Sequence, residues 1–186
     1  MADVAVTYQT YPFDKLESQH YEDAEESFGL LMINEHGEVF IAETPSGNWV
    51  APRGHRNDRE TEFAAAFRET AEETNVRPQF YFLIGTVTHE FTTSYKEKKI
   101  NRNIRYCLTH NERPVWNRPG PVKRRIKYFV IIVGKDITTR QVRLHKKELK
   151  SYMWVTWDVA KQHARGTFIN ALTDAQKIYE KYINMP

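Results

Sequence analysis

Cysteine is almost absent from this chain, since Cys107 is the only one among its 186 residues. A single thiol excludes an intramolecular disulfide and a zinc site built from several cysteines. Long apolar runs are also lacking: the longest, from Tyr128 to Val133, is far shorter than the roughly 20 residues that cross a membrane. The first 28 residues have neither the basic start nor the hydrophobic stretch of a secretory signal. We therefore expect a cytoplasmic protein without membrane contact, whose oligomeric state the sequence leaves open.

Hydrophobic residues make up 40% of the chain and aromatic residues 13%, which predicts one globular domain over residues 1–186. Its core should span about residues 28–182, after an acidic extension over residues 1–27. Charge is segregated along the chain. Residues 1–95 hold 6 Lys and Arg against 17 Asp and Glu, a net charge of −11, whereas residues 96–150 have a net charge of +13. The basic half favours a polyanionic phosphate ligand, although a solvated basic loop would have the same composition.

Three glutamates are spaced so that one helix face would carry all of them. Glu69, Glu72 and Glu73 stand at positions i, i+3 and i+4, which brings their side chains together on a helix. A hard divalent cation such as Mg²⁺ would relieve the repulsion between them, with Mn²⁺ as the alternative ion. The spacing therefore predicts a metal-binding helix face, and the competing interpretation is a solvated acidic surface.

The surrounding residues support a helix there. Phe63, Phe67, Thr70 and Thr74 recur every three or four positions and predict a second face packed on a sheet. Asn57, followed three residues later by Glu60, resembles a capping box, and Asn75 is suited to the left-handed residue past a helix end.

The remaining elements are read from apolar patterning and turn residues. Strands are expected at residues 28–33, 39–43, 49–51, 80–95, 128–133 and 152–157, and residues 103–108 could pair back on the fourth. Asp158 should begin a short helix, and either Thr167 or Asp174 should begin the last one, whose apolar stripe ends at Tyr182. Proline and glycine mark a basic insertion over about residues 96–126.

One stretch of the chain resembles a known signature. Residues 54–76 match the Nudix hydrolase pattern G-x5-E-x7-R-E-U-x-E-E-x-G-U, in which U is aliphatic, and depart from it at Thr70 and Asn75. The matching positions are Gly54, Glu60, Arg68, Glu69, Glu72, Glu73 and Val76. The resemblance implies an α/β fold, a Nudix-type α/β/α sandwich with a mixed sheet and a loop-helix-loop catalytic motif.

The flanks of this box are similar to the asymmetric bis(5′-nucleosyl)-tetraphosphatases, which cut diadenosine tetraphosphate into ATP and AMP. Trp49 and Pro52 to His55 resemble their W-x-x-P-K-G-H motif, with Arg53 in place of lysine. The run Lys127-Tyr128-Phe129 resembles a nucleotide-facing strand of that subfamily. Lys147-Glu148 resembles the stretch that supplies a fourth acidic residue.

The resemblance implies a role for each of these residues. Mg²⁺ would be held by Glu69 and Glu73, with Glu72 and the Gly54 carbonyl. Glu72 is the first choice for the general base and Glu148 the second. Glu60 and Arg68 would form a structural ion pair. Phosphates would be bound by Arg53, His55 and Lys127, and Tyr128 would either stack a base or pack in the core.

Other interpretations remain open at this point. Diphosphoinositol polyphosphate phosphohydrolases share the basic strand. An RNA 5′-end pyrophosphohydrolase would use the basic insertion with Tyr95, Tyr106 and Trp116, which makes RNA an alternative partner. ADP-ribose pyrophosphatases usually carry a proline after the box. They are disfavoured, because no proline stands between Pro78 and Pro114 here. A binding module without turnover is a different class, and an assay of phosphate release with Mg²⁺ separates it from an enzyme.

Overall fold

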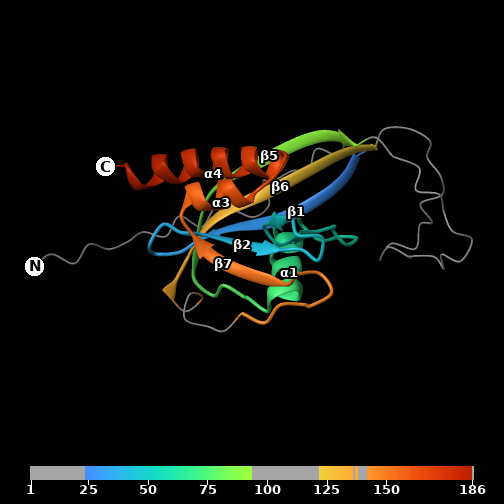
Figure 1. Cartoon of the computed structure of the whole chain (residues 1–186), viewed down its shortest axis with the longest axis horizontal. Helices are drawn as coiled ribbons and strands as arrows, with labels where there is room; N and C mark the ends of the chain where they lie inside the picture. Colours follow the sequence, from blue (N-terminus) through green and yellow to red (C-terminus); the bar gives the residue numbers. More distant parts are fainter. Residues whose placement is uncertain (1–23, 94–121, 136, 138–141, 186) are drawn as a thin grey trace, which may run out of the picture.

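A computed structural model describes residues 24–93, 122–135, 137 and 142–185. The strands are β1 (Ala24–Ile33), β2 (Val39–Glu43), β3 (Trp49–Val50), β4 (Arg53–Gly54), β5 (Tyr81–Thr93), β6 (Val122–Val133) and β7 (Ser151–Val155). They form one mixed sheet in the order β3-β2-β1-β6-β5, with β4 added to β1 and β7 added to β2. Figure 1 shows helix α1 (Glu62–Thr74) below the sheet, and α3 (Trp157–His163) and α4 (Thr167–Ile183) above it. The predicted α/β/α sandwich is confirmed.

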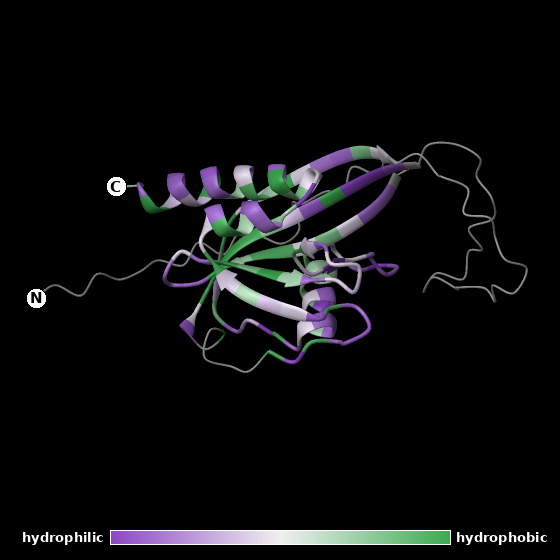
Figure 2. Cartoon of the chain, in the orientation of Figure 1, coloured by the Kyte–Doolittle hydropathy of each residue, from purple (hydrophilic) through white to green (hydrophobic). Residues whose placement is uncertain are grey.

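The centre of the sheet is the parallel pair β1 and β6, which aligns Ala24 with Lys123 and continues to Ile33 beside Ile132. Both faces of β1 are buried. Leu30 belongs to the core between the sheet and α1, and Leu31 belongs to the core between the sheet and helices α3 and α4. Because successive side chains point to opposite faces, a strand covered on both sides must be apolar throughout. Figure 2 shows this apolar band, which turns hydrophilic where β1, β5 and β6 extend beyond the helices.

Helix α1 carries the predicted acidic face. Its N-cap is Thr61, whose hydroxyl accepts the N–H of Ala64 at 3.1 Å, so the expectation of a cap at Asn57 is wrong. The Glu60 carboxylate does accept the backbone N–H of Asn57, but within the loop before the helix. The helix ends at Asn75, whose left-handed φ of 58° confirms the prediction.

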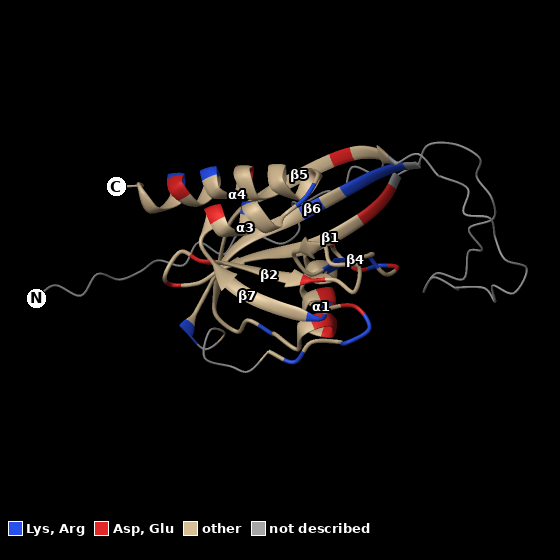
Figure 3. Ribbon diagram, in the orientation of Figure 1, with Lys and Arg blue, Asp and Glu red and all other residues tan. Residues whose placement is uncertain are grey.

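Two strands begin earlier than the sequence indicated. The core was expected to begin at residue 28, but β1 already begins at Ala24. The basic insertion was expected to reach residue 126, but β6 already begins at Val122. The extended ends of these strands pair acid with base. Arg124 lies 3.0 Å from Glu25, and Arg125 lies 2.8 Å from Glu26. In Figure 3 the basic end of β6 lies between acidic residues of β1 and β5.

Other boundaries shift by a few residues. Trp157 opens α3 and is not part of β7, and α4 begins at the earlier of its two candidate positions, Thr167. The stripe of α4 is buried at Leu172 and Ala175, whereas Tyr182 is exposed. The expected strand at 103–108, residues 96–121 of the basic insertion and the three candidate stacking aromatics lie outside the described residues. Within the described part of the chain, no helix combines the length and apolarity needed to cross a membrane.

Candidate active site

Arg68 is the centre of the network on α1. Its guanidinium donates to Glu60 through Nε and Nη2, both at 3.0 Å, and to Glu69 through Nη1 at 2.7 Å. Nη1 also reaches Glu72 at 3.3 Å, and Nη2 donates to the carbonyl oxygen of His55 at 2.7 Å. The predicted Glu60–Arg68 ion pair is therefore present. It joins the loop before the helix to the acidic face, and bidentate pairing fixes the orientation of both groups.

The electrostatics of this network follow from its hydrogen bonds. Burial alone would raise the pKa of Glu60, but the hydrogen bonds from Arg68 and from the Asn57 N–H outweigh burial and lower it. The hydrogen bond to Glu60 raises the pKa of Arg68 above its usual value. The ion pair thus favours the charged forms of both Glu60 and Arg68.

Glu69 lies against Gly54 of β4. A Cβ atom at residue 54 would coincide with the Glu69 carboxylate, so only glycine lets the strand approach the helix this closely. Burial raises the pKa of Glu69, and the hydrogen bond from Arg68 and the charge of His55 oppose that shift. The side chain of His55 is exposed nearby. The two predicted metal-ligating positions in β4 and α1 are therefore adjacent.

Glu73 is the most perturbed acid of the site. Burial raises its pKa to about 8, with further contributions from the negative charges of Glu148 and Glu69. The backbone N–H and the charge of Arg53 act in the opposite direction. A carboxyl group flanked by two others and by an arginine is the arrangement expected where a cation or a phosphate binds.

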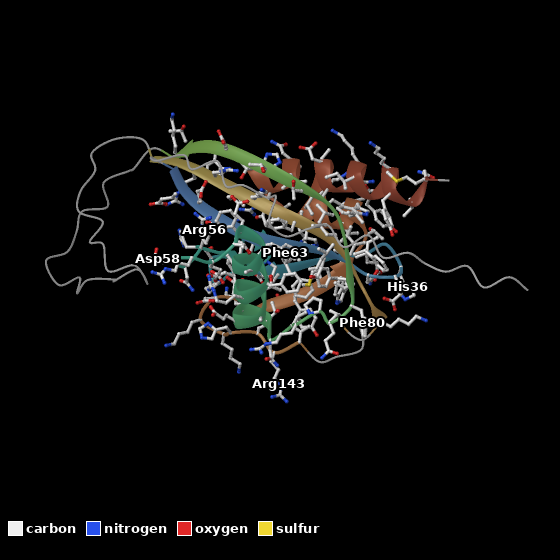
Figure 4. The ribbon with its side chains drawn as sticks, turned by 180° about the vertical axis from the view of Figure 1, so that it is seen from behind. His36, Arg56, Asp58, Phe63, Phe80 and Arg143 are labelled. Carbon is white, nitrogen blue, oxygen red and sulfur yellow. The ribbon has the colours of Figure 1, made fainter. Side chains whose placement is uncertain are left out.

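Glu148 comes to this cluster from a separate loop. The backbone N–H groups of Arg143 and His145 donate to the carbonyl oxygens of Thr74 and Glu73, at 3.1 and 2.7 Å, and so cap the end of α1. Buried Leu149 fixes the loop on its other side. The Glu148 carboxylate lies 3.4 Å from His145 Nδ1 and remains half exposed. Figure 4 shows Arg143 beyond one end of α1 and Arg56 and Asp58 at the other.

The two candidate site residues of β6, Lys127 and Tyr128, point to opposite faces of the sheet. Tyr128 is only 1% exposed and its ring packs on Phe168, which is the second of its two expected roles, packing in the core. Its hydroxyl accepts a hydrogen bond from Arg53 Nη1 at 2.7 Å. Lys127 points to the opposite face, where Nζ lies 2.6 Å from the buried Glu62 carboxylate. That ion pair corrects the expectation of a direct phosphate contact for Lys127.

The residues present suit Mg²⁺, although no three His, Cys, Asp or Glu side chains in the described residues form a complete metal-binding group. Mg²⁺ usually takes only one or two carboxylates from the protein and completes its shell with water and substrate phosphate. The Gly54 cradle around Glu69 and the mutual repulsion of Glu69, Glu73 and Glu148 meet that requirement.

Sequence reasoning missed Glu62, Gly29 and His145. Glu62 directly follows the helix cap, a position where acids are common for reasons of the helix dipole, so its role as the partner of Lys127 had no local signal. Gly29 lies in an apolar strand, where an isolated glycine does suggest a close backbone approach. His145 lies three residues before Glu148, a spacing that could have indicated their contact.

Comparison with known proteins agrees with this geometry. The NUDIX domain family model matches residues 24–173. An RNA pyrophosphohydrolase from Pseudoalteromonas translucida (strain TAC 125) is 23% identical over 131 residues, which are 69% of each chain. The asymmetrical bis(5′-nucleosyl)-tetraphosphatase of Caenorhabditis elegans is 34% identical over 73 residues, 39% of this chain and 51% of that protein. The crystal structure of a C. elegans Ap4A hydrolase binary complex superposes with a TM-score of 0.58 at 18% identity, covering 86% of this chain and 98% of that one.

Proposed function

The chain belongs to the NUDIX domain family and is a pyrophosphohydrolase, and we propose that it cuts a phosphoanhydride bond in a dinucleoside polyphosphate such as diadenosine tetraphosphate with the help of Mg²⁺. One observation carries the proposal. The partly buried Glu73 feels the negative charges of both Glu69 and Glu148 and accepts the backbone N–H of Arg53. Anions gathered beside an arginine suit a polyphosphate that arrives with its own divalent cation.

The ion would be held by Glu69, Glu73 and the Gly54 carbonyl, with Glu72 at the edge of the set. When bound, Mg²⁺ neutralises charge on the phosphate oxygens and acidifies water. The presence of these carboxylates favours an enzyme over a binding module, because a site that only bound phosphate would gain nothing from a cluster of acids, two of which are partly buried.

Water activation falls to Glu148 in this proposal. The sequence favoured Glu72, but the Glu72 carboxylate accepts from Arg68 Nη1 and belongs to its ion-pair network. Glu148 approaches Glu73 from another loop and is half exposed. In the reaction the water oxygen attacks phosphorus, its proton passes to Glu148, and the anhydride P–O bond breaks so that the leaving phosphate takes the electron pair.

The remaining side chains bind and orient the substrate. The Arg53 guanidinium and the exposed imidazole of His55 flank Glu73 and Glu69 and would hold phosphate oxygens. Arg68 and Glu60 keep the acidic face and the preceding loop in register. The side chains of Lys127 and Tyr128 are largely buried, and in this proposal neither contacts a phosphate or a base of the substrate.

The substrate assignment is supported by the motif around Arg53 and by the similarity to the C. elegans tetraphosphatase. The test is a panel of diadenosine polyphosphates, 5′-triphosphorylated RNA, diphosphoinositol phosphates and ADP-ribose, each with saturating Mg²⁺. We expect diadenosine tetraphosphate to be the best substrate and to give ATP plus AMP. Two molecules of ADP would contradict the asymmetric cut. No product from any compound would contradict an enzyme.

RNA 5′ ends are the second candidate, because the similarity to an RNA pyrophosphohydrolase extends over 69% of both chains. In the same panel this activity would appear as inorganic pyrophosphate released from triphosphorylated RNA. A kcat/KM higher for RNA than for every dinucleotide would replace the first assignment with this one.

A further inference from the structure

The side chains of Arg53 and Tyr128 contact each other beside Gly29 of β1, which has no side chain of its own. In the sheet, Gly29 of β1 is aligned with Arg53 of β4 on one side and with Tyr128 of β6 on the other. A Cβ atom at Gly29 would come within 2.7 Å of the Arg53 Cβ and 3.1 Å of the Tyr128 ring, and it would also overlap the Pro52 carbonyl oxygen. Glycine therefore makes the contact between the two side chains sterically accessible.

The tyrosine itself has little freedom. Its ring is almost fully buried, with the Phe168 ring of α4 at a centroid distance of 5.9 Å. A buried phenol hydroxyl needs a hydrogen-bond partner, and here the partner is Arg53 Nη1 at 2.7 Å. A buried acceptor of this kind fixes the guanidinium more firmly than a solvated partner would, because the packing around the ring restricts its movement.

Arg53 in turn borders the reacting centre. Its backbone N–H donates to the Glu73 carboxylate, and its charge acts on that group. A displacement of the guanidinium would thus alter the position of a phosphate relative to the acidic face. Small errors of placement are costly in catalysis, since reacting groups must be held close to the productive geometry.

From these contacts we propose that Tyr128 is a positioning residue, whose hydroxyl fixes the Arg53 guanidinium beside Glu73, and that Gly29 provides the space this contact requires. The proposal rests on the proposed function in taking Arg53 as a phosphate-binding group. It assigns to Tyr128 an action through arginine, in place of a contact with the nucleotide base.

The experiment is a double-mutant cycle with Tyr128→Phe, Arg53→Met and the double variant, assayed for kcat and KM on diadenosine tetraphosphate with saturating Mg²⁺. Tyr128→Phe keeps the ring and removes only the hydroxyl. We expect kcat to fall about tenfold to a hundredfold, the factor associated with a hydrogen bond to a charged group. In the Arg53→Met background the same change should have almost no further effect. Tyr179→Phe, which removes a hydroxyl from α4 above the Gly37 turn, is the matched control and should match wild type.

A second readout does not depend on turnover. The affinity of each variant for inorganic pyrophosphate in the presence of Mg²⁺, measured by calorimetry, should show the same coupling, with melting temperatures recorded in parallel. Wild-type kcat and pyrophosphate affinity in Tyr128→Phe would overturn the proposal, and so would equal, additive losses in both backgrounds. If wild type turns over no compound in the substrate panel, the proposed function fails, and the pyrophosphate cycle alone decides whether Tyr128 positions Arg53.

Discussion

Lys127 and Glu62 form an ion pair of 2.6 Å between β6 and the first turn of α1, with only 13% and 5% of their side chains exposed. The ammonium group also lies 5.4 Å from the centre of the Phe129 ring. The pair connects the central strand to the start of the helix that carries the acidic face. Its burial makes each partner dependent on the other, because an unpaired charge there would be poorly solvated.

Removing one partner should therefore destabilise the fold. We expect Lys127→Met to lower the free energy of unfolding by about 3–5 kcal/mol, since it leaves the Glu62 carboxylate uncompensated. The double variant Glu62→Leu/Lys127→Met should recover most of that loss by replacing the pair with apolar side chains. Urea denaturation of wild type and of the two variants measures this difference. A double variant with wild-type stability but a raised KM would instead support a direct contact between Lys127 and phosphate.

The sequence did not indicate the partners of Lys127 and Tyr128, for a structural reason. A strand covered on both faces gives its polar residues no route to solvent, so each must find a partner elsewhere in the chain. Those partners lie 65 residues away for Lys127 and 75 residues away for Tyr128. Local patterning contains no information about such pairs. The neighbouring box differs, because its spacing follows the helix period.

Within the box the helix period brought Glu69 and Glu73 onto one face. The Glu60–Arg68 pair was instead implied by the resemblance, and the left-handed Asn75 by the residue type that suits a helix end. The approach of Glu148 could not be derived in this way, because it depends on a loop capping the end of α1 with two backbone N–H groups. Only the resemblance indicated that residue.

Glu73 predicts an unusual dependence of stability on pH. Its pKa is about 8 in the folded protein against 4.5 for an ordinary glutamate, through burial first and then the charges of Glu148 and Glu69. Between pH 4.5 and 8 the unfolded chain releases this proton while the folded protein keeps it. Stability should therefore decrease as pH rises through that window, by about 1.4 kcal/mol for each pH unit from this one group.

The measurement is the difference in unfolding free energy between wild type and Glu73→Gln at several pH values from 5 to 8.5. Glutamine does not titrate, so the difference isolates Glu73 from the histidines. We expect the variant to gain on wild type as pH rises. Addition of Mg²⁺ should stabilise wild type more at pH 8 than at pH 6, because a cation favours the ionised carboxylate. A constant difference across the range would show that Glu73 is ionised throughout.

Glu148 and Glu72 can be distinguished by activity. We expect Glu148→Gln to lower kcat by at least about a hundredfold, the lower limit for losing a general base, with little change in melting temperature because the side chain is half exposed. Glu72→Gln should have a smaller effect and should change the Mg²⁺ concentration needed for half-maximal rate. Rates at saturating Mg²⁺ compare the two variants directly. If Glu72→Gln loses more kcat than Glu148→Gln, then Glu72 is the general base, as the sequence favoured.

The last prediction concerns the basic end of β6. It tests whether these arginines attract the substrate or form ion pairs that stabilise the fold. The net charge of +13 over residues 96–150, which include Arg124 and Arg125, favoured a polyanionic phosphate ligand. Each instead pairs with a glutamate of β1, and the two pairs differ in burial. Arg125 and Glu26 have 11% and 16% of their side chains exposed, whereas Arg124 and Glu25 have 43% and 41%.

Neighbouring residues on one strand therefore provide a matched comparison. Arg125→Met should lower the free energy of unfolding by about 3 kcal/mol, because it leaves Glu26 partly buried without its partner. Arg124→Met should cost less than about 1 kcal/mol, as exposed pairs do, and that cost should vanish in high salt. Methionine keeps much of the apolar stem in both cases. If the ion pairs only stabilise the fold, KM for the best substrate stays at the wild-type value in both variants. A salt-sensitive rise in KM in Arg124→Met would instead show that the basic end of β6 attracts the substrate.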